Sequence, residues 1–161
     1  VLNKKSEGMN INDAQDDRYQ RLMDFFEVSS AKWVEVDANV ENELKEVSDD
    51  EKQDFRREFG VLESGIDSLI RKGYELLNLI TYFTTGADET RAWTIKRGSS
   101  APIAGSAIHT DFKDKFIRAE VVSYMKLLEA GSVASARERG LTRTEGKDYI
   151  VQDGDVIEFK I

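Results

Sequence analysis

The stretch Gly98–Tyr124, GSSAPIAGSAIHTDFKDKFIRAEVVSY, decides the fold that we predict for this chain. It opens on a Gly-Ser-Ser turn, and its proline, Pro102, stands where a first helical turn tolerates a missing N–H. We expect a helix over Ala101–Ile108 and a loop over Asp111–Lys115. A strand over Phe116–Tyr124 follows, because apolar and charged residues alternate there.

The chain end predicts two more strands, joined by a turn. Tyr149–Val151 is rich in strand-forming residues, and Gln152–Asp155 is a turn in which Gly154 takes a positive φ. Val156–Ile161 alternates, with its apolar side chains inward and its charged side chains outward. Since the last residues belong to this pattern, we expect the final strand to pair inside a sheet.

An upstream hairpin completes the predicted sheet. Leu79–Thr84 and Glu89–Ile95 are rich in strand-forming residues, and a four-residue turn separates them. The order is therefore hairpin, helix, strand, short helices, hairpin. One helix across a mixed sheet of this order is a β-grasp, or ubiquitin-like, architecture.

The first half of the chain predicts the end of an α/β domain. A strand at Val1–Leu2, a helix at Asp17–Glu27 and a strand at Ala31–Val36 are the closing units of a doubly wound fold. Three helices are expected to follow, at Asn39–Val47, Ser48–Phe59 and Ser64–Leu77. We predict an α+β chain with one domain over residues 1–78 and a second over 79–161.

Composition narrows the function classes. There is no cysteine, which excludes disulfides and thiolate metal sites and fits a reducing cytoplasm. The sequence has no long apolar run, so we expect no contact with a membrane. All of the net charge of −8 falls within residues 1–81, while acidic and basic residues balance over 82–161. The second part is thus less repulsive to a polyanion than the first.

Two runs in the second half resemble a known family. RAWTIKRGSSAPIAGSAIHTDFKDKFIRAEV (91–121) and GKDYIVQDGDVIEFKI (146–161) are similar to the C-terminal TGS domain of the YchF-type, Obg-like P-loop ATPases. The resemblance implies a cytoplasmic protein that binds and hydrolyses ATP, or less specifically GTP, with Mg²⁺, and that engages ribosomes or RNA. Residues 1–78 would then be the last strand-helix-strand of its nucleotide-binding domain with the closing helices.

The resemblance also implies a nucleotide-base contact at Asn3, Lys4 and Ala38. The family has an Asn-x-x-Glu motif at the first position, whereas here Glu7 comes one residue later, in Asn3-Lys4-Lys5-Ser6-Glu7. An asparagine amide both donates to and accepts from a purine edge. The alternative is an ordinary loop asparagine. Ala38 would contribute a backbone contact; the alternative at that loop is a helix cap formed by Asp37.

Lys113, Lys115 and Arg118 are the candidate RNA or ribosome contact. They lie beside two phenylalanines, and cations next to aromatic rings suit single-stranded RNA. The alternative is that Phe112 and Phe116 anchor a solvated loop in the core. The competing function is a protein-interaction module that docks a partner through the β-grasp sheet, without nucleic-acid binding.

No catalytic residue and no metal ligand is assigned. His109 is the single histidine, and we expect it to bond to a backbone group or to Asp111. A Gly-x-x-x-x-Gly-Lys-Ser/Thr loop does not occur in the sequence, so it provides no phosphate cradle of that type. The chain begins without methionine and is expected to be a fragment of a longer protein. Whether it is an enzyme therefore depends on the intact protein.

We predict that the purified chain alone does not hydrolyse nucleotides, because it lacks this phosphate-binding loop. Phosphate release from ATP and GTP with Mg²⁺ should equal the protein-free blank. Release that persists after contaminating ATPases have been excluded would contradict the prediction.

Overall fold

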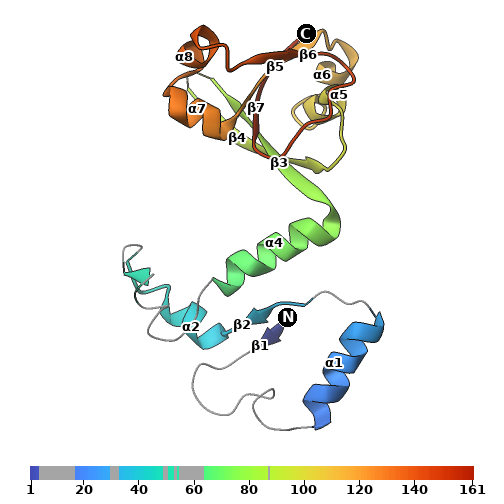
Figure 1. The fold of residues 1–161 in the computed structure, drawn as a ribbon, viewed down its shortest axis with the longest axis vertical. Coiled ribbons are helices and arrows are strands. Elements are labelled where there is room, and N and C mark those ends of the chain that lie inside the picture. The colour runs from blue at the N-terminus through green and yellow to red at the C-terminus, as the bar shows by residue number, and fades with distance from the viewer. Residues whose placement is uncertain (4–16, 30–32, 49–50, 53, 55–63, 87) are drawn as a thin grey trace. The chain divides into compact units, whose positions relative to one another are not determined.

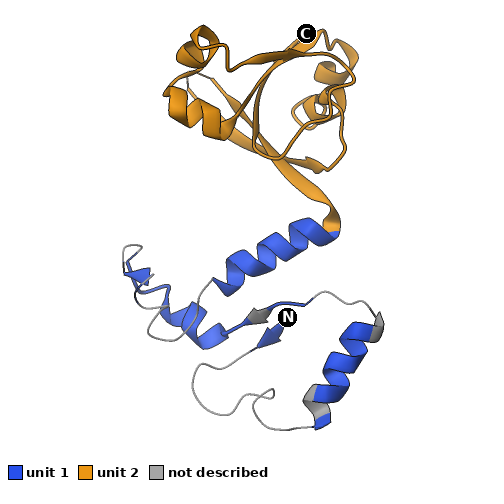
Figure 2. Cartoon of the chain, viewed as in Figure 1, with its two compact units in different colours: residues 1–76 blue, residues 77–161 orange. Residues whose placement is uncertain are grey.

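The computed structural model describes residues 1–3, 17–29, 33–48, 51–52, 54, 64–86 and 88–161. The chain divides into two compact units, Val1–Leu76 and Leu77–Ile161 (Figure 2). Each unit has its own sheet, and each is described by itself.

Unit 1 contains a strand-helix-strand motif (Figure 1). Strands β1 (Leu2–Asn3) and β2 (Glu35–Val36) pair in parallel, and helix α1 (Asp17–Ser29) lies between them in the sequence. A parallel pair needs such a crossover connection. The motif confirms the predicted α/β closing unit. The predicted strand started at Ala31, but residues 30–32 lie outside the described part of the chain.

Two further helices are described in full in unit 1. They are α2 (Ala38–Glu43) and α4 (Gly65–Leu77). The Glu41 Oε1 atom accepts a hydrogen bond from the backbone N–H of Gly65 at 2.6 Å, so a carboxylate from α2 caps the start of α4. A Cβ at Gly65 would lie 2.8 Å from Val36 Cγ1, so only glycine fits this contact between the helix and β2. The helix predicted over Ser48–Phe59 falls mostly outside the described residues.

Unit 2 is built on a five-stranded mixed sheet in the order β4-β3-β7-β5-β6. The strands are β3 (Leu79–Thr85), β4 (Thr90–Lys96), β5 (Arg118–Ser123), β6 (Arg143–Glu145) and β7 (Asp155–Lys160). Only β3 and β7 pair in parallel. This sheet confirms the predicted β-grasp. The last strand does pair inside the sheet, since β7 lies between β3 and β5, and Gly154 has φ 80° as predicted.

Short helices pack on the two faces of this sheet. They are α5 (Ala101–Gly105), α6 (Asp111–Asp114), α7 (Tyr124–Ala130) and α8 (Val133–Glu138). Figure 1 shows α5 and α6 on one side of the strands and α7 and α8 on the other. We call the α5/α6 side the core face and the α7/α8 side the second face.

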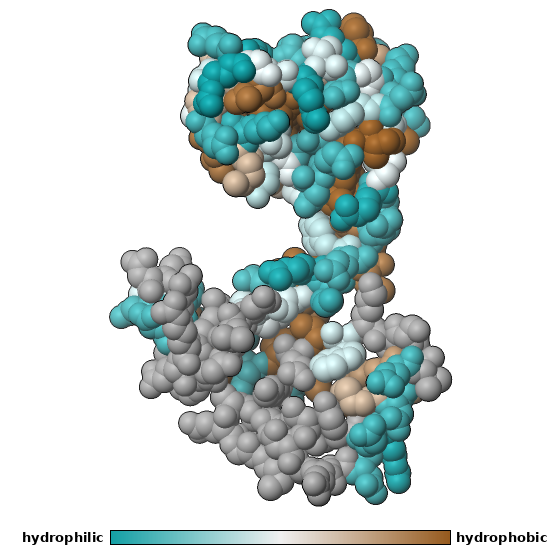
Figure 3. All heavy atoms as spheres, viewed as in Figure 1, coloured by the Kyte–Doolittle hydropathy of each residue, from teal (hydrophilic) through white to brown (hydrophobic). Residues whose placement is uncertain are grey.

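Strand alternation separates the residues of the two faces. Ile157 and Phe159 of β7 join the main core with Tyr82 and Val121, while Val156 joins a smaller cluster on the second face. The face of unit 2 seen in Figure 3 shows apolar patches separated by hydrophilic residues. Among the described helices, none combines the length and apolar character needed to cross a bilayer.

Several predicted elements were wrong. The segment expected as a loop over Asp111–Lys115 begins with helix α6, and Tyr124 starts α7 instead of ending β5. Tyr149–Val151 is no strand: Ile150 makes only an isolated bridge to Ser100, and the sheet's fifth strand is Arg143–Glu145. Local propensity could not place these pairings, because they join segments distant in sequence.

Two isoleucines that we expected to point into the core are exposed. Ile161 is 49% exposed and Ile117 is 62% exposed, although both continue the apolar alternation. The reason is that β7 ends at Lys160 and β5 starts at Arg118, so these two isoleucines lie at the end of the sheet.

Tyr82→Phe should lower the free energy of unfolding by about 0.5 to 1.5 kcal/mol. The Tyr82 hydroxyl donates to the Ala104 carbonyl at 2.9 Å, and both residues are fully buried. The variant loses this hydrogen bond, while the carbonyl still accepts one from the Ala107 N–H at 3.0 Å. Urea unfolding should show the loss, whereas Tyr124→Phe, at a half-exposed tyrosine, should change little. Equal effects of the two substitutions would contradict the prediction.

Candidate functional site

The structure brings together two of the predicted base-contact residues. Asn3 ends β1, and Ala38 follows the end of β2 by two residues. Because the two strands are parallel, their carboxyl ends meet at one edge, where α/β sheets place ligands. The Asn3 Oδ1 atom accepts a hydrogen bond from the Ala38 N–H at 3.0 Å. Lys4 and Glu7 lie outside the described residues.

This hydrogen bond fixes which groups face outward at the edge. The donor is a backbone N–H, so the oxygen of the Asn3 amide must point toward Ala38. The Asn3 Nδ2 group is then the donor that the side chain can offer to a ligand. Asp37 has a different role: its Oδ1 atom accepts from the N–H groups of Asn39 and Val40 at 3.0 and 3.1 Å. The helix-cap alternative for Asp37 is confirmed.

The three cations of the predicted RNA contact differ in their surroundings. Lys115 Nζ bonds to Asp111 Oδ2 at 2.8 Å, and this hydrogen bond holds the pKa of Asp111 below its usual range and raises that of Lys115. Within the described residues, no ion pair is made by Lys113 or Arg118. Lys115 is thus partly neutralised by Asp111, whereas Lys113 and Arg118 have no oppositely charged partner within the described residues.

The neighbouring aromatic and histidine side chains have structural roles. Phe112 and Phe116 pack edge-to-face on Phe159, with ring centroids 5.8 and 6.4 Å apart. The alternative that the phenylalanines anchor in the core is therefore confirmed, and neither ring is free to stack on a base. His109 Nδ1 accepts a hydrogen bond from the Asp111 N–H at 3.1 Å, as expected for a structural histidine.

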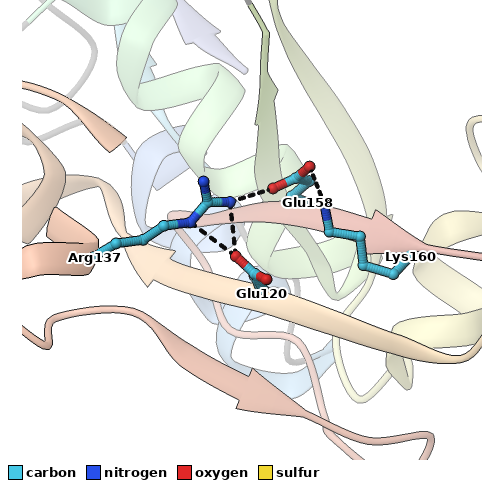
Figure 4. A network of polar contacts seen from close by, with 4 residues as sticks. All are labelled: Glu120, Arg137, Glu158 and Lys160. Atoms are coloured by element: carbon cyan, nitrogen blue, oxygen red, sulfur yellow. Dashed lines mark hydrogen bonds and ion pairs between the residues drawn. The ribbon is translucent and has the colours of Figure 1, made fainter. Parts of the chain in front are cut away.

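A network that the sequence analysis missed lies on the second face of the sheet, beside Arg118. Figure 4 shows Arg137, from α8, reaching two carboxylates on neighbouring strands. Its Nη2 atom lies 2.7 Å from Glu120 Oε2 and 2.6 Å from Glu158 Oε2. Lys160 also bonds to Glu158. We call these four residues the carboxylate network. The alternation in Val156–Ile161 predicted that Glu158 and Lys160 point outward. The sequence did not predict that β7 pairs with β5, and this pairing brings Glu120 next to Glu158.

The register explains why an arginine stands there. Glu120 lies directly opposite Glu158 in the β5/β7 ladder, and like charges in that position repel. The guanidinium between them removes the repulsion. Hydrogen bonding to Lys160 is the main cause that lowers the pKa of Glu158, and Arg137 adds to it. The pKa of Arg137 is raised, chiefly by its hydrogen bond to Glu120.

A small hollow borders this network. It is lined by Thr85, Val122, Val133, Thr142 and Val156 together with members of the network, and it encloses about 30 Å³ of space. A water molecule needs roughly 10–15 Å³ by this measure, so the hollow holds a few waters and no nucleotide. The described residues contain no cluster of metal-binding side chains either.

The fold thus defines a two-part α+β chain: the end of an α/β unit followed by a β-grasp. Comparison with known proteins agrees. The family described as "YchF-GTPase_C: Protein of unknown function (DUF933)" matches residues 79–161, just over half of the chain. The chain belongs to the YchF family.

The sequence similarity to known proteins also covers part of the first unit. "Ribosome-binding ATPase YchF" of Bacillus subtilis (strain 168) is 48% identical over 140 residues, which make up 87% of this chain and 38% of that protein. The protein of the same name from Pasteurella multocida (strain Pm70) is 49% identical over 140 residues, 87% of this chain and 39% of its own length. The chain therefore corresponds to the C-terminal part of these proteins and spans about two fifths of their length.

Solved structures show the same fold. The Schizosaccharomyces pombe YchF GTPase matches 90% of this chain and 39% of its own, with TM-score 0.77 and 29% identity. A GTP-binding protein from Pyrococcus horikoshii OT3 matches 91% of this chain and 42% of its own, with TM-score 0.59 and 20% identity. The second likeness concerns the fold alone.

Lys160→Gln should raise the pKa of Glu158 toward its ordinary value, because the hydrogen bond from Lys160 is the main cause that lowers it. A carboxyl with a lowered pKa stabilises the fold above its unfolded-state pKa and loses this effect as the pH falls through its folded-state pKa. In the variant this contribution should be smaller, and its loss should be complete at a higher pH. Carbon-13 NMR titration of the side-chain carboxyl measures the change. The control, Lys126→Gln on α7, should leave Glu158 unchanged; an unchanged Glu158 in Lys160→Gln would contradict the prediction.

Proposed function

We propose that this chain is the C-terminal part of a cytoplasmic, ribosome-associated protein that binds and hydrolyses ATP, or GTP, with Mg²⁺. The single observation that carries the proposal is the 48% identity to a ribosome-binding ATPase over 87% of the chain. The phosphate and Mg²⁺ sites would belong to the N-terminal part of the intact protein. The present chain would contribute the base-contact edge and the β-grasp unit.

The base contact is proposed at Asn3, with Lys4 and Ala38 as backbone partners. Asn3 and Ala38 lie at the carboxyl edge of β1 and β2, which is where a doubly wound sheet binds nucleotides. The hydrogen bond between them holds the asparagine so that its Nδ2 group can donate to a ring nitrogen of a purine. Guanine-specific sites use an aspartate as a hydrogen-bond acceptor. The proposed contact through the Asn3 Nδ2 group does not need such an aspartate.

Contact with the ribosome or RNA is proposed for the β-grasp unit, through Lys113, Lys115 and Arg118. The balanced charge of residues 82–161 lets this unit approach a polyanion, unlike the acidic first part. Lys113 and Arg118 supply the charge most directly, since Lys115 must leave Asp111 to bind a phosphate.

A protein partner is the second candidate function of the same unit. The observation that favours it is strand β4, a seven-residue strand at the edge of the sheet. Long edge strands accept an added strand from another chain. Binding to a purified protein partner that does not weaken with salt, without binding to RNA, would favour this function.

Asn3→Asp in the intact protein should weaken ATP binding about tenfold, which is roughly 1.4 kcal/mol, while the fold stays intact. The carboxylate still accepts the hydrogen bond from Ala38 N–H but has no N–H for the purine. Asn3→Ala should lose both interactions and bind no more tightly than Asn3→Asp. Isothermal titration calorimetry with ATP and Mg²⁺ measures the affinity, and thermal unfolding checks the fold. An unchanged dissociation constant in Asn3→Asp would remove Asn3 from the base site.

A further inference from the structure

Two cations lie directly opposite each other on the second face of the β-grasp sheet. Arg118 begins β5, and its partner in the β5/β7 register is Lys160. Side chains of directly opposed residues in an antiparallel pair point to the same side and approach closely. Like charges in this position are unfavourable, so the pair needs a compensating anion.

The chain compensates this pair only in part. Lys160 forms an ion pair with Glu158. Glu158 also pairs with Arg137, and Arg137 pairs with Glu120 as well. The three cations of Arg118 and the carboxylate network face two carboxylates, so one positive charge is left over. Arg118 makes no ion pair within the described residues, and its side chain is exposed. The unbalanced charge therefore lies at the Arg118 end of the group.

The surroundings leave room at this end of the sheet. Strand β6 stops at Glu145, and the next residue, Gly146, has no side chain to cover Arg118. A flexible anion that lies across the strands can contact both opposed cations. A phosphodiester carries the single charge that is missing, and arginine binds its oxygens in a bidentate manner.

We propose that Arg118 and Lys160 together bind a phosphate of an RNA backbone, and that Glu158 is a positioning residue that tethers Lys160 when no RNA is bound. The proposal rests on the proposed RNA function and assigns it a site. It adds Lys160, a residue 42 positions away from Arg118 in the sequence, and gives Lys115 a minor role because Lys115 already pairs with Asp111. Such a contact recognises the charge of the RNA backbone and does not depend on the base sequence.

The test measures binding of the intact protein to poly(U) across a salt series. Arg118→Gln and Lys160→Gln should each make the slope of log affinity against log salt shallower, and the double variant should make it shallower by about 0.7, the value for the one single-strand phosphate contact that the pair shares. Lys126→Gln, at another cation of the same unit, is the matched control and should keep the wild-type slope. Circular dichroism and thermal unfolding check the fold of every variant.

Glu158→Gln separates binding from structural damage. It breaks the same ion pair as Lys160→Gln but frees the lysine and removes a negative charge. RNA affinity should therefore rise in Glu158→Gln and fall in Lys160→Gln. If the ion pair only stabilises the sheet, both substitutions should change affinity in the same direction, and that result would overturn the proposal.

The remaining outcomes are also decisive. If the intact protein binds poly(U) but both Gln variants of the pair keep the wild-type slope, the pair is not the site, and the proposed RNA function stands without it. If the intact protein binds neither ribosomes nor poly(U), both proposals fail. Competition by poly-glutamate as effective as competition by poly(U) would overturn the assignment to RNA and favour an acidic protein partner.

Discussion

The insertion of β7 between β3 and β5 is the constraint on which the β-grasp unit depends. This strand is the last in the chain, yet it joins the hairpin of β3 and β4 to the pair β5 and β6. Its pairing with β3 is parallel and with β5 antiparallel. Without it the sheet would fall into two separate two-stranded pairs, each too small to be stable alone.

The same strand fixes the chemistry of both faces. Side chains alternate along β7, so its register decides at once that Phe159 enters the core and that Lys160 stands on the second face. A slip of one residue would exchange the two faces. The core therefore selects the register, and the register then brings Glu158 opposite Glu120 and Lys160 opposite Arg118. The charge pattern of the surface is a consequence of apolar packing on the other side.

The first unit shows a comparable coupling on a smaller scale. The parallel pairing of β1 with β2 brings Asn3 beside Ala38, although 35 positions separate them. Asp37 caps α2 at the same loop, and Glu41 from that helix caps α4. A loop held by such backbone hydrogen bonds keeps the Asn3 amide in one orientation.

The sequence by itself determined the family, the β-grasp class, the positive φ of Gly154 and the inclusion of the last strand in the sheet. These properties follow from local patterns: alternation, turn residues and long matching motifs. Only the tertiary structure decided that Arg143–Glu145 forms the fifth strand, that Asp111 pairs with Lys115, and that Arg118 meets Lys160. Each of these depends on which segments lie side by side, and pairing between distant segments is set by the packing of the whole core and not by the propensity of any one stretch.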